Sequence, residues 1–289
     1  MLIVGLFFSF IFLNGCSNVS KEEGKIDDKK EIYKAVTAGD ILPFFDHWNL
    51  IAGDGSNVGN ASILEHKDFF YTANDEAGDW VVFKSPNAGN THGTSNNIRT
   101  ELAQLKKWSA FTANKLSATL KVMNVSATGD ARVAASYSVV VGQIHSADGH
   151  ENEPLKIFYK KFPGHDKGSV FWHYEINTAG DDNSGRWDYS TAAWGDDFSA
   201  MGKEENTYPA EPLGGIALGE EFSYEIKVDD GIMHLTFKSE GHETKTFTKN
   251  LIKSEYSSKE NIPQQTKNLF FPIGQDGMER ENAYADEGL

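Results

Sequence analysis

Cysteine is almost absent from this chain, and so is any long apolar segment. The single cysteine, Cys16, excludes a disulfide within the chain. The apolar run 2–13 is shorter than the roughly 20 residues that a membrane-spanning helix needs. The sequence shows no Gly-rich phosphate loop, nucleophile elbow or histidine spacing typical of a metal site. We therefore expect neither a cofactor nor a metal.

Positive charge is also scarce. The chain has 27 Lys and Arg residues against 42 Asp and Glu residues, and its formal net charge is −15. Because proteins bind phosphate backbones largely through Lys and Arg, this balance argues against a nucleic-acid partner. It remains compatible with an acidic polymer if the cations gather locally in a groove.

The first forty residues have the composition of a leader. The apolar run has the length of a secretory signal, although no Lys or Arg precedes it. Leu13-Asn14-Gly15-Cys16 resembles a bacterial lipobox, in which the cysteine becomes the lipid-modified first residue. We predict a lipoprotein signal peptide over 1–16 and a flexible charged tether over 17–40, which would anchor the protein to the outer membrane or the cell surface. The alternative is an ordinary free cysteine behind a signal.

From residue 41 onward, short apolar or alternating runs are separated by Gly, Asn, Asp and Ser, and no long amphipathic helix is evident. Asp229-Asp230-Gly231 is a strong hairpin signal. The pattern predicts one all-β domain over 41–289, a jelly-roll β-sandwich of antiparallel strands with long surface loops over 146–154 and 177–212. The predicted strands are 48–52, 79–84, 98–105, 115–125, 131–145, 155–162, 170–176, 222–228 and 233–237.

Two short phrases carry chemically capable side chains at alternate positions. On a strand, Arg99-Thr100-Glu101-Leu102 presents its Arg and Glu on one face and its Leu on the other. Gln143-Ile144-His145 presents its Gln and His in the same way. A cation, an amide and an imidazole that face one way from neighbouring strands would suit a bound carboxylate beside a proton that is to be removed. This is the geometry of a lyase acting on a uronic acid.

The same phrases resemble signatures of the alginate lyases of polysaccharide lyase family seven. The first matches Arg-Ser/Thr-Glu-Leu and the second Gln-Ile/Val-His, while Trp48-Asn49-Leu50 and Lys156-Ile157-Phe158-Tyr159 are similar to further strands of that family. The ordered set covers most of 41–237. The resemblance implies a jelly-roll lyase that cleaves alginate or oligoalginate by β-elimination, and we expect a monomer.

The resemblance also implies roles for individual residues. Arg99 and Gln143 would neutralise the sugar carboxylate. His145 would take the C5 proton, or help to neutralise the carboxylate if another residue is the base. Glu101 would hold Arg99 in place and, with Lys156, support substrate binding. The isoleucine of the second phrase favours guluronate-containing stretches of the polymer.

The resemblance breaks near the end of the chain. Family members carry a late strand reading Tyr-Phe-Lys-Ala-Gly-x-Tyr-x-Gln, whose second tyrosine is the usual proton donor. The nearest phrase here, 270–275, lacks both tyrosines and the lysine, and its Pro272 is poorly suited to a central strand. We therefore expect a C-terminally truncated domain without that strand and its tyrosine. Stand-in candidates, each more typical of a core, strand or loop position, are Tyr159, Tyr174, Tyr189 and Tyr284.

The missing tyrosine keeps a second function open, that of a non-catalytic surface lipoprotein that binds alginate or another carbohydrate. The aromatic residues Trp187, Tyr189 and Trp194 in the predicted loop 177–212 would either stack on sugar rings or anchor the loop to the core. A jelly-roll glycoside hydrolase ranks well behind, because the chain has no Glu-x-Asp-x-x-Glu run.

Overall fold

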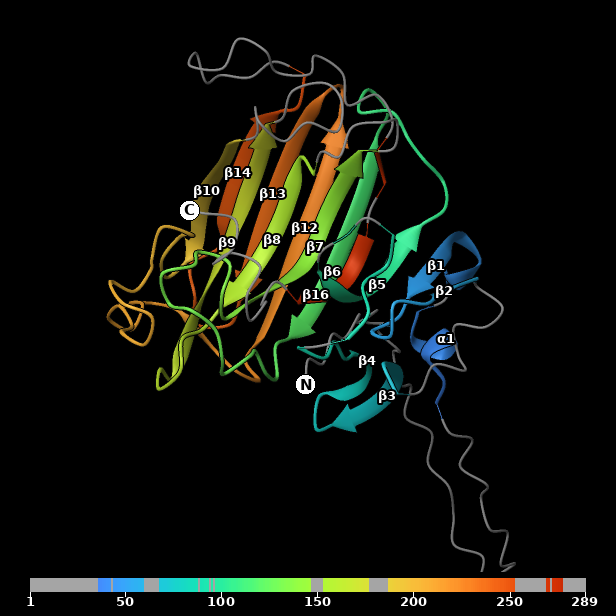
Figure 1. Cartoon of the computed structure of the whole chain (residues 1–289). Coiled ribbons are helices and arrows are strands. Elements are labelled where there is room, and N and C mark those ends of the chain that lie inside the picture. The colour runs from blue at the N-terminus through green and yellow to red at the C-terminus, as the bar shows by residue number, and fades with distance from the viewer. Residues whose placement is uncertain are drawn as a thin grey trace, which may run out of the picture.

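Antiparallel strands are the main regular structure of the computed structural model, which describes residues 36–42, 44–59, 68–87, 89–93, 95, 97–146, 153–176, 187–252, 269–270 and 272–277 (Figure 1). The predicted signal peptide with Cys16, most of the predicted tether, and Tyr284 lie outside these residues. In the described part, no helix is long and apolar enough to cross a membrane. The helical elements there are the short α1 (Ala38–Ile41) and η1 (Phe45–His47).

The larger sheet has ten strands in the described residues, in the order β10-β9-β8-β7-β16-β5-β1-β2, with β11 beside β9 and β15 beside β7. Its described strand pairs are antiparallel. The strands are β1 (Trp48–Ile51), β2 (Asn57–Val58), β5 (Ile98–Gln104), β7 (Ser138–Ser146), β8 (Leu155–Lys160), β9 (Lys167–Ile176), β10 (Trp187–Trp194), β11 (Ile216–Ala217), β15 (Leu269–Phe270) and β16 (Pro272–Gly277).

A smaller sheet, in the order β14-β13-β12-β6, forms the second layer. Its strands are β6 (Asn114–Lys121), β12 (Glu221–Asp229), β13 (Ile232–Ser239) and β14 (Lys245–Asn250), and a separate hairpin pairs β3 (Phe70–Asp75) with β4 (Gly78–Phe83). Asp229 pairs with Ile232 across the predicted β12–β13 turn. The two turn residues, Asp230 and Gly231, have φ values of 47° and 75°, as a tight two-residue hairpin requires.

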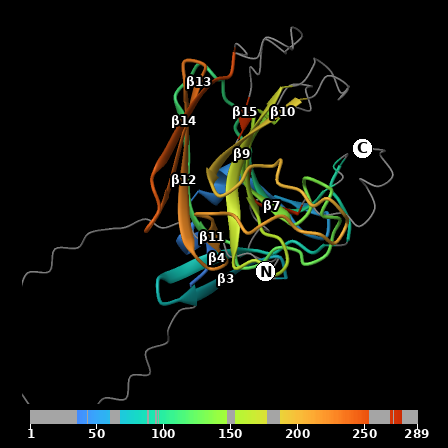
Figure 2. The ribbon, with the colours of Figure 1, turned by 90° about the vertical axis from the view of Figure 1, so that its left-hand side faces the viewer.

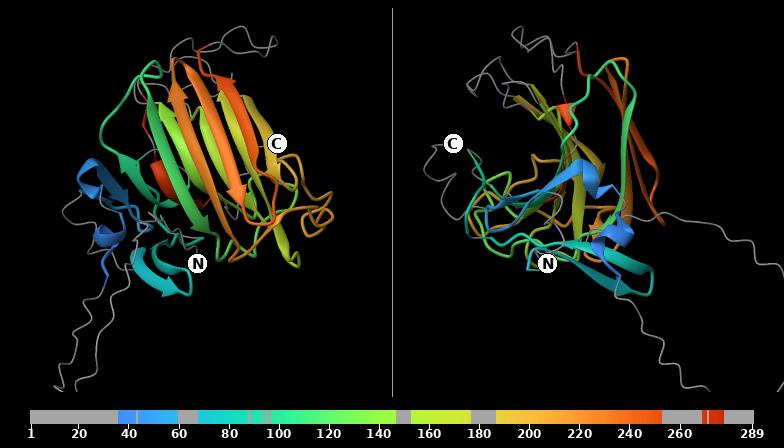
Figure 3. Two further views of the ribbon diagram at one scale, coloured as in Figure 1. Left: turned by 180° about the vertical axis from the view of Figure 1, so that it is seen from behind. Right: turned by 90° about the vertical axis from the view of Figure 1, so that its right-hand side faces the viewer.

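The two layers face each other across one apolar core (Figures 2 and 3). The larger sheet contributes side chains such as Leu102, Val141 and Tyr159, and the smaller sheet contributes Tyr224 and Phe237, all of them buried. The prediction of an all-β jelly-roll sandwich is confirmed. We call the face of the larger sheet that points away from this core the outer face.

The centre of the larger sheet corrects one expectation. β16 lies between β5 and β7 and pairs with both of them, so a strand occupies the central position that we expected to be missing. Pro272 is the first residue of β16, where a proline is tolerated because the ladder has only begun. The family's tyrosine phrase remains absent from the sequence, and the predicted truncation of the domain remains a prediction.

Two predicted boundaries were also wrong. The predicted loop 177–212 contains strand β10, which pairs along β9. The predicted strand 131–145 begins only at Ser138, because Tyr137 has a φ of 60°, which an extended strand does not allow. Residues 131–137 form turns instead. Most other predicted strands agree with the structure to within a few residues.

Candidate active site

β5 and β7 flank the central strand β16 and bring the two predicted phrases onto the same face of the sheet. On β5, Leu102 points into the core between the layers, so Arg99 and Glu101 point to the outer face. On β7, Ile144 is part of the core, and Gln143 and His145 therefore share that outer face. These four side chains thus share one face of the sheet, and the contacts described next join Arg99, Glu101 and Gln143.

A β-bulge in β7 sets the direction of the second phrase. The pairing of β7 with β8 shifts register between Val140 and Gly142. Val140 packs in a separate apolar cluster on the outer face, whereas Val141 packs in the core. A Cβ added to Gly142 would lie 2.7 Å from Cζ of the buried Tyr224, on the core side. Two successive residues thus point inward, and the bulge re-aims Gln143 and His145 to the outer face.

Glu101 connects the two phrases directly. Its Oε1 lies 3.7 Å from Nη1 of Arg99, and its Oε2 accepts a 2.8 Å hydrogen bond from Nε2 of Gln143. Nη2 of Arg99 also donates to Oγ of Ser95. The side chain of Arg99 is 17% exposed and that of Glu101 only 5%. The carboxylate therefore orients the guanidinium and the amide from below, while the guanidinium retains access to solvent.

The imidazole of His145 is oriented by the backbone of Ser146, the last residue of β7. Nδ1 lies 2.6 Å from the carbonyl oxygen of Ser146. A carbonyl only accepts, so Nδ1 carries a proton in this contact and Nε2 is the nitrogen that exchanges a proton when the ring is neutral. Oε1 of Glu153 lies 3.7 Å from Nε2.

Lys156 is buried beside this histidine rather than extended into solvent. Its Nζ lies 3.1 Å from Oε2 of Glu153 and 3.4 Å from Oε2 of Glu175. Its side chain is 7% exposed, and that of Glu175 is fully buried. The lysine that we predicted to bind substrate is thus engaged by two carboxylates at the edge of the site.

The comparison with known proteins identifies the family. A family model described as "Alginate lyase" matches residues 42–274, which is most of the chain. The chain belongs to this alginate lyase family. It is therefore a polysaccharide lyase, and the family signature that we read in β5 and β7 lies inside the matched region.

Individual relatives of this lyase agree in fold and sequence. The crystal structure of the exolytic PL7 alginate lyase AlyA5 from Zobellia galactanivorans is 55% identical, with a TM-score of 0.78 over 83% of each chain. An alginate lyase from Klebsiella pneumoniae is 28% identical over 250 residues, 73% of this chain and 76% of the relative. An alginate lyase crystal structure from Klebsiella pneumoniae, 23% identical, shares the fold with a TM-score of 0.64, over 82% of this chain and 90% of the other.

The stand-in tyrosines of this lyase point away from the outer face where the structure describes them. Tyr159 and Tyr174 donate their hydroxyls to the carbonyls of Ile216 and Asn250 at 3.0 and 3.3 Å, and burial raises the pKa of Tyr159. Tyr189 pairs with Tyr174 and packs against the core. These three tyrosines serve the core of the sandwich.

Two aromatic residues of the predicted loop 177–212, Tyr189 and Trp194, anchor β10 in the same way, while the side chain of Trp187 lies outside the described part of the structure. Trp194 is buried, and its Nε1 donates to the carbonyl of Glu243 at 3.0 Å. Tyr189 is half-buried against the core. For these two residues, the anchoring interpretation agrees with the structure.

Sequence reasoning did not find Glu153 and Glu175. Glu175 had a detectable signal, because β9 alternates Phe171, His173 and Glu175 on the outer face against Trp172 and Tyr174 in the core. A carboxylate at a buried strand position usually has a charged partner. Glu153 had no such signal, because it precedes β8 in a segment without periodicity.

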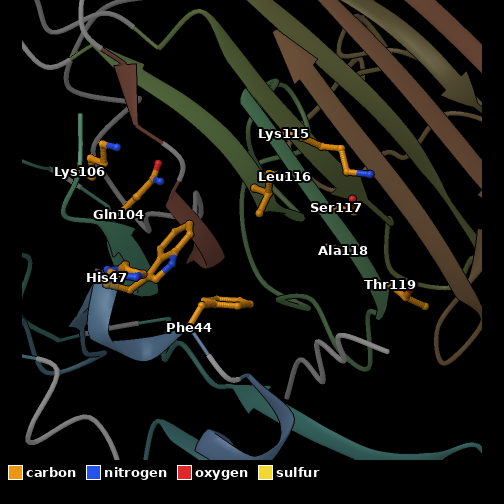
Figure 4. Close-up of a pocket in the computed structure, with 10 residues that line it drawn as sticks. Phe44, His47, Gln104, Lys106, Lys115, Leu116, Ser117, Ala118 and Thr119 are labelled. Carbon is orange, nitrogen blue, oxygen red and sulfur yellow. The ribbon is translucent and has the colours of Figure 1, made fainter. Parts of the chain in front are cut away.

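The structure also contains a cavity of about 740 Å³ that is separate from these residues (Figure 4). It lies between the sheet margins and is lined by Phe44, His47, Trp48, Gln104, Lys106 and residues 115–119 of β6. Gln104 occupies the same face of β5 as the core residue Leu102, opposite Arg99 and Glu101. We therefore place the chemistry on the outer face and not in this cavity.

Proposed function

We propose that this family member cleaves alginate by β-elimination, with Arg99, Gln143 and His145 as its catalytic residues. The observation that carries the proposal is the link through Glu101, which joins the guanidinium on β5 to the amide on β7 on the face that also presents His145. This set combines a carboxylate-binding cation, a hydrogen-bond donor and a proton acceptor.

The chemistry needs each of these groups. The C5 proton of a uronate is weakly acidic until the adjacent carboxylate is neutralised. Arg99 and Gln143 supply charge-assisted hydrogen bonds to that carboxylate, and these strengthen as negative charge builds up during proton removal. Nε2 of His145 takes the C5 proton, the C5–H electron pair forms the C4=C5 double bond, and the C4–O4 bond breaks with its electron pair on O4.

Protonation of O4 completes the reaction. The family's tyrosine phrase is absent from β16, and the described stand-in tyrosines Tyr159, Tyr174 and Tyr189 serve the core. We therefore assign no separate general acid to this step: the protonated His145 returns its proton to O4. One histidine in both roles predicts a slower enzyme than one with a separate acid, since a general acid contributes on the order of 100- to 10,000-fold.

Two features support a proposal for the preferred substrate and for the mode of cleavage. Ile144 within the Gln-Ile-His phrase favours guluronate-containing stretches, as in the family resemblance. The relative from Zobellia galactanivorans with 55% identity is exolytic, which supports release of short products from chain ends. Product analysis by chromatography on polyguluronate and polymannuronate distinguishes these outcomes.

We further propose that the mature protein is a lipoprotein attached through Cys16 to the outer membrane or the cell surface. The lipobox-like Leu13-Asn14-Gly15-Cys16 after a short apolar run supports this. Mass spectrometry of the membrane-associated protein should find an acylated Cys16, and Cys16→Ala should release the protein from the membrane fraction. An unmodified, soluble wild-type protein would contradict the proposal.

The lyase proposal is tested by the ultraviolet absorbance of the unsaturated product sugar after alginate is added. Arg99→Ala and His145→Ala should each lower this rate by on the order of 100-fold or more. Arg132→Ala and His234→Ala are matched controls, since both residues lie away from the site and Arg132 forms an exposed pair with Asp130. Alginate binding without product formation would support the carbohydrate-binding alternative.

A further inference from the structure

Three charged side chains extend in a chain of contacts from the proton-exchanging edge of His145 and have no part in the chemistry described above. Glu153 lies 3.7 Å from Nε2 of His145 and 3.1 Å from Nζ of Lys156, and Lys156 in turn lies 3.4 Å from Glu175. The chain of contacts runs from the half-exposed imidazole to a fully buried carboxylate. A buried ionic chain that ends at a catalytic side chain is a candidate for positioning that side chain.

The position of Glu153 is fixed from two directions. Its carboxylate is held by Nζ of Lys156, and its backbone N–H donates to Oε1 of Glu175 at 3.4 Å. Lys156 and Glu175 lie on the neighbouring strands β8 and β9, with side chains 7% and 0% exposed. Because buried side chains of adjacent strands move little, Glu153 is attached to a rigid base.

Protonation of His145 balances the charges of these four side chains. Glu153 and Glu175 contribute two negative charges, whereas Lys156 contributes one positive charge. The proton that His145 takes from the substrate supplies the missing charge at Nε2, directly opposite Oε1 of Glu153. At 3.7 Å, these two atoms are farther apart than in a hydrogen bond, so the carboxylate stabilises the imidazolium by its charge, while the proton stays on Nε2 until it passes to O4.

We propose that Glu153, held by Lys156 and Glu175, is a positioning residue that orients the imidazole of His145 and stabilises the imidazolium formed during proton removal. Two opposite contacts define the ring orientation: Nδ1–H donates to the carbonyl of Ser146, and Nε2 faces the carboxylate. The carboxylate does not touch the substrate in this role. It lowers the barrier by stabilising charge that appears only after the proton moves.

The inference rests on the proposed function, and Glu153→Gln tests it because the amide keeps the size of the side chain while it removes the charge. We expect kcat to fall on the order of 10- to 100-fold while KM stays within about threefold, since orientation of the base is lost and carboxylate binding by Arg99 is not. Glu153→Asp should recover part of kcat. A purely structural role would lower stability and leave kcat of the folded variant unchanged.

The matched control is Glu225→Gln, because Glu225 also pairs with a lysine, Lys115 at 2.9 Å, but lies on the exposed surface of the smaller sheet. Its kcat and KM should equal those of the wild type. An unchanged kcat in Glu153→Gln, or an equal loss in Glu225→Gln, would overturn the inference.

A spectroscopic measurement separates this inference from the lyase proposal. The ring nitrogens of His145 are observed by nitrogen-15 NMR of the full chain without substrate and assigned with His145→Asn. The Nε2 signal should move in Glu153→Gln and stay in place in Glu225→Gln, whether or not the wild type turns over alginate. An Nε2 signal that is identical in wild type and Glu153→Gln would sink the inference even if the enzyme is active.

Discussion

The two ends of strand β8 present buried lysines on the same face of the sheet, yet with opposite surroundings. Lys156 at one end lies between the carboxylates of Glu153 and Glu175. Lys160 at the other end donates to the backbone carbonyls of Ala134 and Ala200, at 2.8 and 3.0 Å. One lysine therefore belongs to a charged cluster, and the other to a contact between loops.

The aromatic side chains near Lys160 account for its lack of a charged partner among the described residues. Phe158, Phe171 and Phe198 pack on the outer face around the middle of β8, and Nζ of Lys160 lies 4.7 Å from the ring centre of Phe162. Rings and carbonyls stabilise an ammonium group without supplying a counter-charge, so burial lowers the pKa of Lys160 to about 8. The partners, and not the residue type or its burial, therefore decide which of the two lysines has a counter-charge.

Removal of Lys156 should have the largest effect on stability. Lys156→Met leaves the fully buried Glu175 without this cation, and the loss of one partner of a buried ion pair costs about 3–5 kcal/mol. The free energy of unfolding from chemical denaturation measures this cost. The double variant Lys156→Met/Glu175→Leu should lose much less, because the fully buried charge is gone and Glu153, which loses the same lysine, is partly exposed. An equal loss of stability in both variants would mean that the charges of Lys156 and Glu175 do not stabilise each other.

The candidate active site was only partly predictable from the sequence. The alternation in Arg99-Thr100-Glu101-Leu102 and Gln143-Ile144-His145 was sufficient to predict one shared face. The contact of Glu101 with Gln143 depends on β16, which separates β5 from β7 by one strand. Its sequence, with Pro272 at the start and two glycines, has little strand propensity, so only tertiary pairing accounts for this strand.

Three further features were not predicted from the sequence, each for a local reason. The strand β10 was hidden in a segment rich in Asp and Gly, although Tyr189 and Trp194 were available as signs of packing against the core. The β-bulge next to Gly142 left no periodic signal, because it interrupts the alternation that strand prediction uses. Glu153 reaches His145 from outside any strand, and only the folded hairpin reveals that contact.

The burial of Lys160 at its end of β8 leads to a prediction about the pH dependence of stability. The pKa of Lys160 is lowered from 10.5 to about 8, so between these values the unfolded chain binds more protons than the folded one. The free energy of unfolding contributed by Lys160 should therefore rise with pH across this window, by up to about 3 kcal/mol. Denaturation of wild type and Lys160→Met over this range measures the difference.

The control for that experiment is Lys161→Met, which removes one positive charge from the adjacent position and corrects for the change in net charge. The gap between wild type and Lys160→Met should widen in favour of the wild type as pH rises. A gap that is constant with pH would show that the carbonyls of Ala134 and Ala200 compensate fully for burial of the ammonium, and that the two ends of β8 are less different than their partners suggest.

The smallest effect on stability is expected from a change at the β-bulge of β7, which directs Gln143 and His145 to the outer face. In Gly142→Ala, the new methyl group would meet the buried ring of Tyr224, whose hydroxyl donates to the carbonyl of Val141 at 3.0 Å. Such overpacking costs about 1–3 kcal/mol. Gly59→Ala is the control, since an added Cβ there meets nothing within 4 Å. Because the strain acts one residue before Gln143, kcat should fall in the folded Gly142→Ala variant, and a stable variant with wild-type kcat would show that the bulge does not set the direction of these side chains.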